Sequence, residues 1–168
     1  MVYALGLVFG VAVACAVVAL LFKKKLLDMT FDERQELARG KAFQYGFFTL
    51  VGCVLLYGTL DGAGLHWCDT LTGSVLCVCV ALGVFAVTCI LNDAYLSLKE
   101  KPRKVMTCFV LLTVLNLAIG AINVMNGTVV EDGGLAPGSV NLIVGVTTLV
   151  ILAVYVVNYL LAQQEETE

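Results

Sequence analysis

The sequence predicts an all-α integral membrane protein: a bundle of five transmembrane helices with the N-terminus outside and the C-terminus inside. The first supporting observation is composition, because 60 % of the residues are hydrophobic and 14 % are charged, whereas about 25 % charged is usual in soluble domains. The second is that the apolar residues form long charge-free blocks. The third is that all ten basic residues lie in two of the connections between blocks. Together they predict one membrane domain over residues 1–168.

Each block is long enough to cross a bilayer once. A helix rises about 1.5 Å per residue and the hydrocarbon layer is about 30 Å thick, so about 20 residues span it. No block is long enough to cross twice, and the mean hydropathy of the chain, +0.96, argues against a separate soluble domain. The predicted spans are residues 2–22, 42–60, 71–91, 105–125 and 140–162.

The basic residues predict how the chain is threaded. Six of them lie between residues 23 and 41, and four lie between residues 99 and 104. Connections rich in Lys and Arg stay in the cytoplasm, and five spans place both of these connections on that side. A chain without the span at 42–60 would carry basic residues on both sides. The sequence therefore predicts this orientation in the lipid bilayer of the plasma membrane.

Residues 31–41 are predicted to form a cytoplasmic helical extension of the second span. Thr30 precedes Glu33 by three residues, which is the spacing of a capping box at a helix N-terminus. No proline interrupts the sequence from Phe31 to Leu60, so we expect one continuous helix. Its weakest point is Gly40, because glycine inside a helix costs about 1 kcal/mol relative to alanine.

The same extension carries an acidic face, which we expect to pair with the other basic connection. The face consists of Asp32, Glu33 and Glu36, with Arg39 beside them. The predicted partners are Lys99, Lys101, Arg103 and Lys104. Exposed pairs of this kind contribute about 0–1 kcal/mol each. Two alternatives stay open: the face docks a cytosolic partner, or its carboxylates bind a divalent cation or share a proton.

The segment from Asp32 to Phe43 also resembles a known sequence pattern. An Asp-Glu-Arg run precedes a Lys-Ala pair and then an aromatic-rich span. The residues that carry the pattern are Asp32, Glu33, Arg34, Gln35, Gly40, Lys41, Ala42 and Phe43. The segment is similar to the juxtamembrane signature of small multi-pass membrane proteins of Gram-positive bacteria, which are uncharacterised in function. The resemblance implies a bacterial plasma membrane and no particular activity.

A polar stripe runs along the predicted fourth span. Thr113, Asn116 and Asn123, together with Gly120, recur at helical spacing. An amide without a partner in hydrocarbon costs several kcal/mol, so we expect the stripe to face the bundle interior or a polar cavity. It either holds helices together by hydrogen bonds or lines a small-molecule path. Transporters usually carry ionisable Asp, Glu, Lys, Arg or His side chains in their spans, and these spans have none.

The first span carries a ridge of small residues. Gly6, Gly10 and Ala14 are spaced four apart, which allows another helix to approach closely. We expect this ridge to pack against another helix of the same chain; homodimerisation is the alternative.

The cysteines predict neither a disulfide framework nor a metal site. Six of the seven lie in the predicted spans, where free cysteine behaves as a small apolar residue. Only Cys68 is expected at the outer surface. His66, Cys68 and Asp69, with Asp61 nearby, are interpreted as a polar turn, and a metal clasp is the alternative.

The sequence contains few residues arranged as a catalytic site would need. It has one histidine, and neither a Ser-His-Asp set nor a glycine-rich phosphate loop is apparent. We therefore predict a non-enzymatic membrane module, a structural, regulatory or accessory subunit, without cofactor, metal or nucleic acid. Its partners would be the bilayer, further copies of the chain or another membrane protein. The alternative is a small-solute transporter or permease-like protein that uses the polar stripe, and an enzyme comes third.

Overall fold

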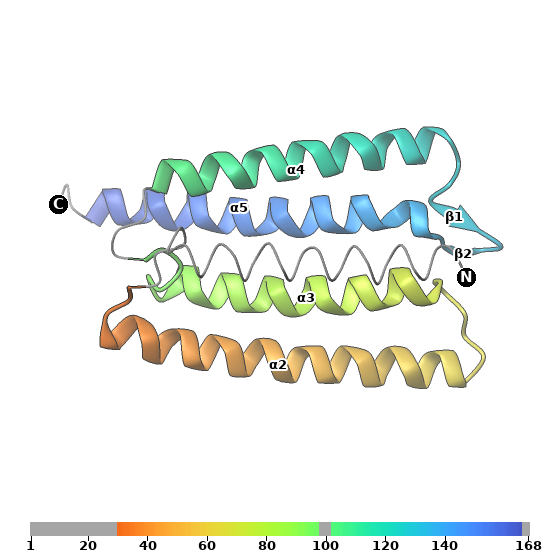
Figure 1. The fold of residues 1–168 in the computed structure, drawn as a ribbon, viewed down its shortest axis with the longest axis horizontal. Coiled ribbons are helices and arrows are strands. Elements are labelled where there is room, and N and C mark those ends of the chain that lie inside the picture. The colour runs from red at the N-terminus through yellow and green to blue at the C-terminus, as the bar shows by residue number, and fades with distance from the viewer. Residues whose placement is uncertain (1–29, 98–101, 166–168) are drawn as a thin grey trace.

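The computed structural model describes residues 30–97 and 102–165, which form an all-α bundle with one small hairpin (Figure 1). The elements are α2 (Glu33–Gly62), α3 (Thr70–Leu91), α4 (Pro102–Met125), β1 (Val130–Glu131), β2 (Gly134–Leu135), the short 3₁₀ helix η1 (Pro137–Ser139) and α5 (Val140–Glu165). The long helices lie side by side in the order α2, α3, α5, α4. The chain therefore passes from α3 across α5 to the outer position of α4 before it returns.

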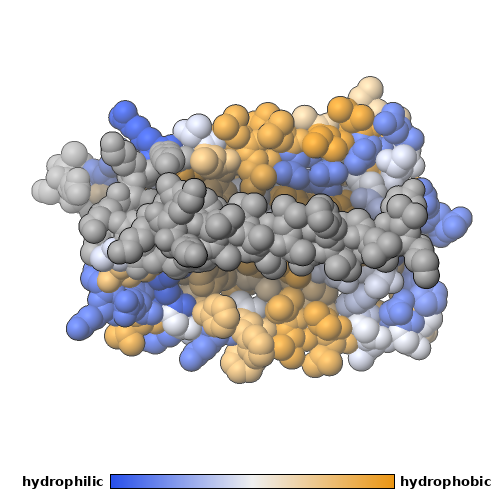
Figure 2. Space-filling view, viewed as in Figure 1, coloured by the Kyte–Doolittle hydropathy of each residue, from blue (hydrophilic) through white to orange (hydrophobic). Residues whose placement is uncertain are grey.

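Four helices in the described part of the chain are long and apolar enough to cross a membrane. They contain the predicted spans 42–60, 71–91, 105–125 and 140–162, so the prediction of helices at these four places is confirmed. The remaining predicted span, residues 2–22 with Gly6, Gly10 and Ala14, lies outside the described residues. Figure 2 shows hydrophobic residues over the middle of the bundle and hydrophilic residues toward its two ends.

The predicted start of α2 was wrong by two residues. The N-cap is Asp32, whose carboxylate accepts a hydrogen bond from the Gln35 amide at 2.6 Å, while the Gln35 side chain accepts one from the Asp32 amide at 3.3 Å. Asp32 is a suitable cap because its short carboxylate reaches the free amides and its charge is favoured at a helix N-terminus. Thr30 therefore lies outside the helix. The predicted continuity is confirmed, since α2 runs through Gly40 without a break.

Small residues let the helices approach closely. A Cβ atom placed on Gly120 of α4 would lie 3.1 Å from the Leu142 Cα atom of α5. One placed on Gly46 of α2 would lie 3.2 Å from the Ala81 carbonyl oxygen of α3. Backbone atoms of a neighbouring helix retreat less easily than a flexible side chain, so both positions favour glycine.

The core lies where α3 meets α5. Ala86, Ile90 and Ile151 are buried there, and four partly buried residues pack against them. These four are Tyr95, Phe109, Val154 and Tyr155. Most of the other large apolar side chains point outward.

A hairpin that the sequence analysis did not anticipate closes one end of the bundle, called here the hairpin end. β1 and β2 are antiparallel, with Val130 opposite Leu135. Asp132 and Gly133 form the turn with φ angles of 50° and 80°, the left-handed values of the two-residue turns that join such strands. Leu135 also bridges Cys68, so the hairpin ties the α2–α3 connection to the α4–α5 connection.

Replacing Gly120 by leucine should destabilise the bundle, and replacing Gly52 should not. A leucine side chain at position 120 would meet the α5 backbone, which should cost about 1–3 kcal/mol in overpacking. Nothing lies within 4 Å of a Cβ on Gly52. Thermal unfolding of the two purified variants in detergent measures the difference. Equal melting temperatures would contradict the close α4–α5 contact.

Candidate functional site

The end of the bundle opposite the hairpin end, called here the Asp93 end, is built around the Asn92–Ser97 segment that follows α3. This segment turns back against the bundle at Asp93, whose φ of 52° is left-handed. The amide of Ala94 then donates to the carbonyl oxygen of Cys89 at 2.8 Å, and Ala94 is fully buried. The segment is therefore part of the packed structure, not a loose connection.

Two side chains of α2 hold this segment by its backbone. Gln35 Nε2 donates to the carbonyl oxygens of Asp93 at 2.8 Å and Leu96 at 3.4 Å. Arg39 Nη1 donates to the carbonyl oxygen of Ala94 at 3.0 Å. We call this set of bonds the Gln35–Arg39 clamp. It satisfies carbonyl groups that no helix or strand pairs, and unpaired buried carbonyl groups are costly.

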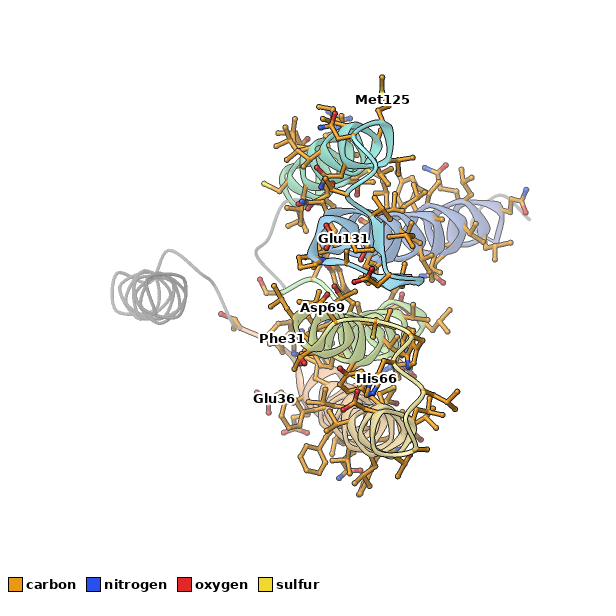
Figure 3. All side chains as sticks on the ribbon, turned by 90° about the vertical axis from the view of Figure 1, so that its right-hand side faces the viewer. Phe31, Glu36, His66, Asp69, Met125 and Glu131 are labelled. Atoms are coloured by element: carbon orange, nitrogen blue, oxygen red, sulfur yellow. The ribbon has the colours of Figure 1, made fainter. Side chains whose placement is uncertain are left out.

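Aromatic rings fix the position of the Arg39 guanidinium. Its Cζ atom lies 4.1 Å from the centre of the Phe31 ring and 5.8 Å from that of the Phe85 ring. Both distances are within the range of cation–π attraction. Figure 3 places Phe31 next to α3 and Glu36 on the outer side of α2. Arg39 thus joins the segment before α2, α3 and the Asn92–Ser97 segment.

The carboxylates of the acidic face make no described ion pair with the second basic connection. The Asp32 carboxylate caps α2, and Glu33 and Glu36 are exposed. Arg34 lies 3.9 Å from Asp93, with both side chains largely in solvent. Lys99 and Lys101 lie outside the described residues, as does the side chain of Lys104, while Arg103 is exposed. Pairing of the acidic face with these four residues stays a prediction.

Each polar side chain of the α4 stripe donates a hydrogen bond within the chain. Thr113 is buried and its hydroxyl donates to that of Thr148 in α5 at 3.0 Å. Asn123 Nδ2 donates to the carbonyl oxygen of Gly138 in η1 at 2.9 Å. Asn116 Nδ2 donates instead to Leu112 of its own helix at 2.8 Å. The stripe therefore joins α4 to α5 through Thr113 and to η1 through Asn123, while Asn116 bonds within α4.

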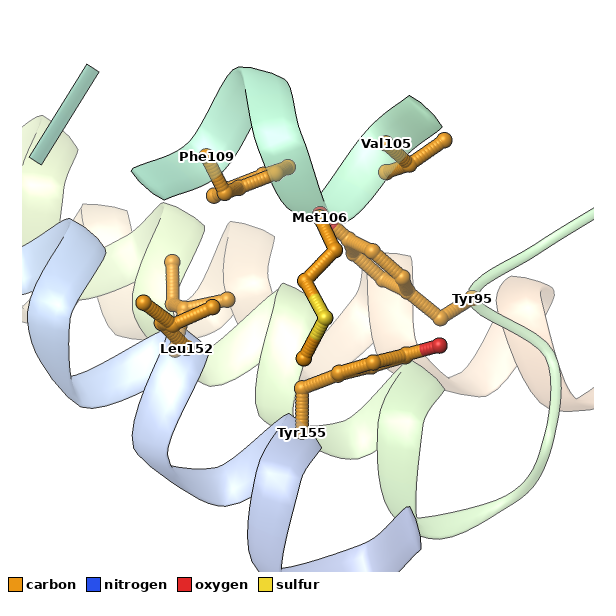
Figure 4. Close-up of a pocket in the computed structure, with 7 residues that line it drawn as sticks. Tyr95, Val105, Met106, Phe109, Leu152 and Tyr155 are labelled. Atoms are coloured by element: carbon orange, nitrogen blue, oxygen red, sulfur yellow. The ribbon is translucent and has the colours of Figure 1, made fainter. Parts of the chain in front are cut away.

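A small pocket between α4 and α5 shows how closely these helices pack (Figure 4). Its volume is about 10 Å³, and apolar side chains with two tyrosine rings line it, among them Met106, Phe109 and Leu152. A space of this size holds about one water molecule. This pocket offers no path for a solute beside the stripe.

At the hairpin end, the expectation that Cys68 reaches the outer surface was wrong. Cys68 is buried because its strand-like backbone pairs with Leu135: the Leu135 amide donates to Trp67 and the Asp69 amide donates to Leu135. Burial raises the pKa of the Cys68 thiol above its usual value, and the negative charge of Asp69 adds to the rise. The thiol is therefore protonated and poorly reactive at neutral pH.

The neighbouring polar residues take structural roles. Asp69 caps α3 through the Leu71 amide, at 2.8 Å, and through the Thr72 hydroxyl. His66 and Asp61 are hydrogen-bonded at 2.8 Å. Within residues 30–97 and 102–165, no three His, Cys, Asp or Glu side chains are grouped as metal ligands would be.

An open apolar groove runs between α2 and α3. Phe43, Gly46, Phe47 and Leu50 form one wall and Val78, Ala81, Leu82 and Phe85 form the other, around a volume of about 270 Å³. Phe43 is 68 % exposed and Phe47 is 53 % exposed, although both are large aromatic residues. Because the groove is open and its walls are apolar, it is suited to receive an apolar side chain or ridge from outside the described bundle.

Replacing Arg39 by methionine should loosen the Asp93 end. The change keeps the apolar stem but removes the donor to the Ala94 carbonyl, which should cost about 1–3 kcal/mol of unfolding free energy. Arg34→Met is the matched control, because its exposed pair with Asp93 is worth about 0–1 kcal/mol. Thermal unfolding in detergent compares the two. An equal loss in both variants would contradict a special role for Arg39.

Comparison with known proteins adds no family assignment: no protein-family model, no curated protein and no solved structure matches this chain. The resemblance of the Asp32–Phe43 segment to membrane proteins of Gram-positive bacteria stays a prediction. The candidate sites are therefore the Gln35–Arg39 clamp, the polar pairs of α4 and the α2–α3 groove, each defined by its own geometry.

Proposed function

We propose that this chain is a non-enzymatic multi-pass membrane protein that acts as a structural or accessory subunit. In this proposal the α2–α3 groove binds a transmembrane helix of a partner membrane protein. The observation that carries the proposal is the groove itself, which has phenylalanine side chains on both walls and no covering element among the described helices. Helices in a bilayer associate by close packing of this kind. The hydrophobic effect does not drive them together, because the surrounding lipid tails are as apolar as the side chains.

Exposed apolar residues extend beyond the groove. Phe47 is in the groove, while the adjacent Phe48 points elsewhere on α2 and is 69 % exposed. Leu55 and Leu56, also adjacent to each other, are 64 % and 61 % exposed. Successive helical residues differ by about 100° in direction, so the uncovered surface extends around α2. One additional helix, such as residues 2–22, would cover only part of it.

The five-span arrangement belongs to the same proposal. Residues 2–22 would supply the first span, the N-terminus would be outside and the Asp93 end would face the cytoplasm of a bacterial cell. The distribution of basic residues supports this orientation. The likeness of the Asp32–Phe43 segment to bacterial membrane proteins supports the plasma membrane.

The alternative, a small-solute transporter or permease-like protein, has weaker support. It requires the stripe of Thr113, Asn116 and Asn123 to present polar groups to a solute. Each of these groups instead has a hydrogen bond within the chain. The stripe is better suited to holding α4 against α5 and η1.

Reporter fusions test the orientation. A reporter active only in the cytoplasm should work when fused after Glu168 and fail when inserted at Gly64 or Gly133. Gly64 and Gly133 lie in the two connections of the hairpin end, which the proposal places outside. Activity at Gly64 would contradict the five-span arrangement.

Replacing groove residues tests whether a partner protein binds in the groove. In mild detergent the wild-type chain should purify in a fixed ratio with one membrane protein, identified by mass spectrometry. Phe43→Ala with Phe47→Ala should reduce this association at least tenfold, since aromatic anchors dominate such contacts. Phe48→Ala, which removes an equally exposed ring outside the groove, should leave it intact.

A photo-cross-linker at position 47 identifies the occupant directly. The proposal expects an adduct with the same partner, and none from a cross-linker at Val114, an exposed residue of α4. An adduct with residues 2–22 of the same chain would show that the groove is filled internally. An adduct with lipid alone would show that it is unoccupied by protein. Either result would contradict partner binding in the groove.

A further inference from the structure

A second cavity lies at the Asp93 end, on the other side of the Asn92–Ser97 segment from the clamp. Its volume is about 180 Å³, and it is open on one side. The residues that line it include three tyrosines, Tyr95, Tyr155 and Tyr159, together with Asp93 and Asn158. Drug-sized ligands occupy pockets of about 300–1,000 Å³, so this space fits a single chemical group and not a large molecule.

The rings are held in place by their neighbours. The centres of the Tyr95 and Tyr155 rings are 6.4 Å apart and the rings are tilted by 55°, so the two rings form an angled aromatic pair. Tyr95 also packs edge-on against Phe109, with ring centres 5.9 Å apart. Tyr159 lies one turn after Tyr155 on α5, and its hydroxyl accepts a hydrogen bond from Gln163 at 3.0 Å. The aromatic pair therefore exists before any ligand binds.

The polar groups of the cavity favour a cation. Asp93 is the acidic residue among the described lining residues, and its side chain and that of Arg34, 3.9 Å away, are both mostly in solvent. Asn158 donates one hydrogen bond from Nδ2 to the Ile90 carbonyl oxygen at 3.3 Å, and its amide oxygen can accept a bond from an ammonium N–H. No Lys or Arg side chain is among the described lining residues. Aromatic faces beside a carboxylate form an environment that attracts a cation with apolar substituents.

We propose that this cavity binds an alkylammonium group, with the tyrosine faces around the methyl or methylene substituents and Asp93 facing the charge. The site is independent of the α2–α3 groove and of any partner bound there. The same group could belong to a lipid headgroup or to a free solute. Both sources share the chemistry that the cavity recognises.

Thermal unfolding with tetramethylammonium chloride tests the site. The full chain is purified in an uncharged maltoside detergent, and sodium chloride at equal concentration is the control for salt. A bound ligand stabilises the folded state as its concentration rises, so tetramethylammonium should raise the melting temperature above the sodium chloride value. Equal melting in the two salts would overturn the proposal.

Variants locate the effect. Tyr159→Leu and Asp93→Asn should each weaken the apparent affinity about fivefold or more, as expected for loss of one cation–π or charge contact. Both are suited to the test, because Tyr159 is half exposed and asparagine tolerates the left-handed backbone at position 93. Tyr45→Leu, an exposed ring of α2 away from the cavity, is the matched control. An equal loss in Tyr45→Leu, or no loss in the two cavity variants, would overturn the assignment to this cavity.

Nanodiscs distinguish the two sources. If the ligand is a headgroup, phosphatidylcholine should occupy the cavity and abolish the stabilisation by added tetramethylammonium, whereas phosphatidylglycerol should leave it. If the ligand is a free solute, tetramethylammonium should stabilise the protein equally in both lipids. Both patterns require the cavity to bind the ammonium group, and absence of stabilisation in both lipids would overturn the proposal.

Discussion

The contact between Arg39 and the Ala94 carbonyl determines how the Asp93 end is built. Ala94 is fully buried, and its carbonyl receives a donor at 3.0 Å from a guanidinium that two aromatic rings also contact. The neighbouring residues depend on this contact. Tyr95 enters the core beside Ile90 and Ile151, while Asp93 remains at the edge of the adjacent cavity. A charged side chain of α2 thereby positions an aromatic residue of the segment after α3.

A second constraint acts throughout the bundle: every polar group away from water needs a partner. Thr113 donates a hydrogen bond to Thr148, Asn123 donates one to Gly138, and Asn116 donates one to a carbonyl of its own helix. Among the described buried side chains, the Ser97 hydroxyl is the exception, since it has no hydrogen-bond partner. These contacts are within the chain, so the stripe is suited to holding α4 in place. The apolar groove of α2 and α3, which no other described helix covers, supports the proposed role in assembly.

The sequence was sufficient to predict the helices because length and hydropathy decide whether a segment can cross a bilayer. All four predicted spans in the described part lie within observed helices. It was insufficient for the clamp, because Gln35 and Arg39 bind backbone carbonyl groups more than fifty residues away, and carbonyl groups have no sequence signature. The burial of Cys68 was missed for the same reason. The hairpin had a local signal, Asp132–Gly133, which two very short strands on either side made easy to overlook.

Hydrogen exchange of the Asn92–Ser97 segment measures whether the Gln35–Arg39 clamp holds this segment against the bundle. The Ala94 amide, bonded to Cys89 and held under the clamp, should exchange much more slowly than the Gly64 amide in the exposed α2–α3 connection, although both lie in non-helical segments. Gln35→Leu combined with Arg39→Met should raise the exchange rate of Ala94 at least tenfold and leave the rest of α3 protected. An Ala94 amide that exchanges as fast as Gly64 in the wild-type chain would contradict the account.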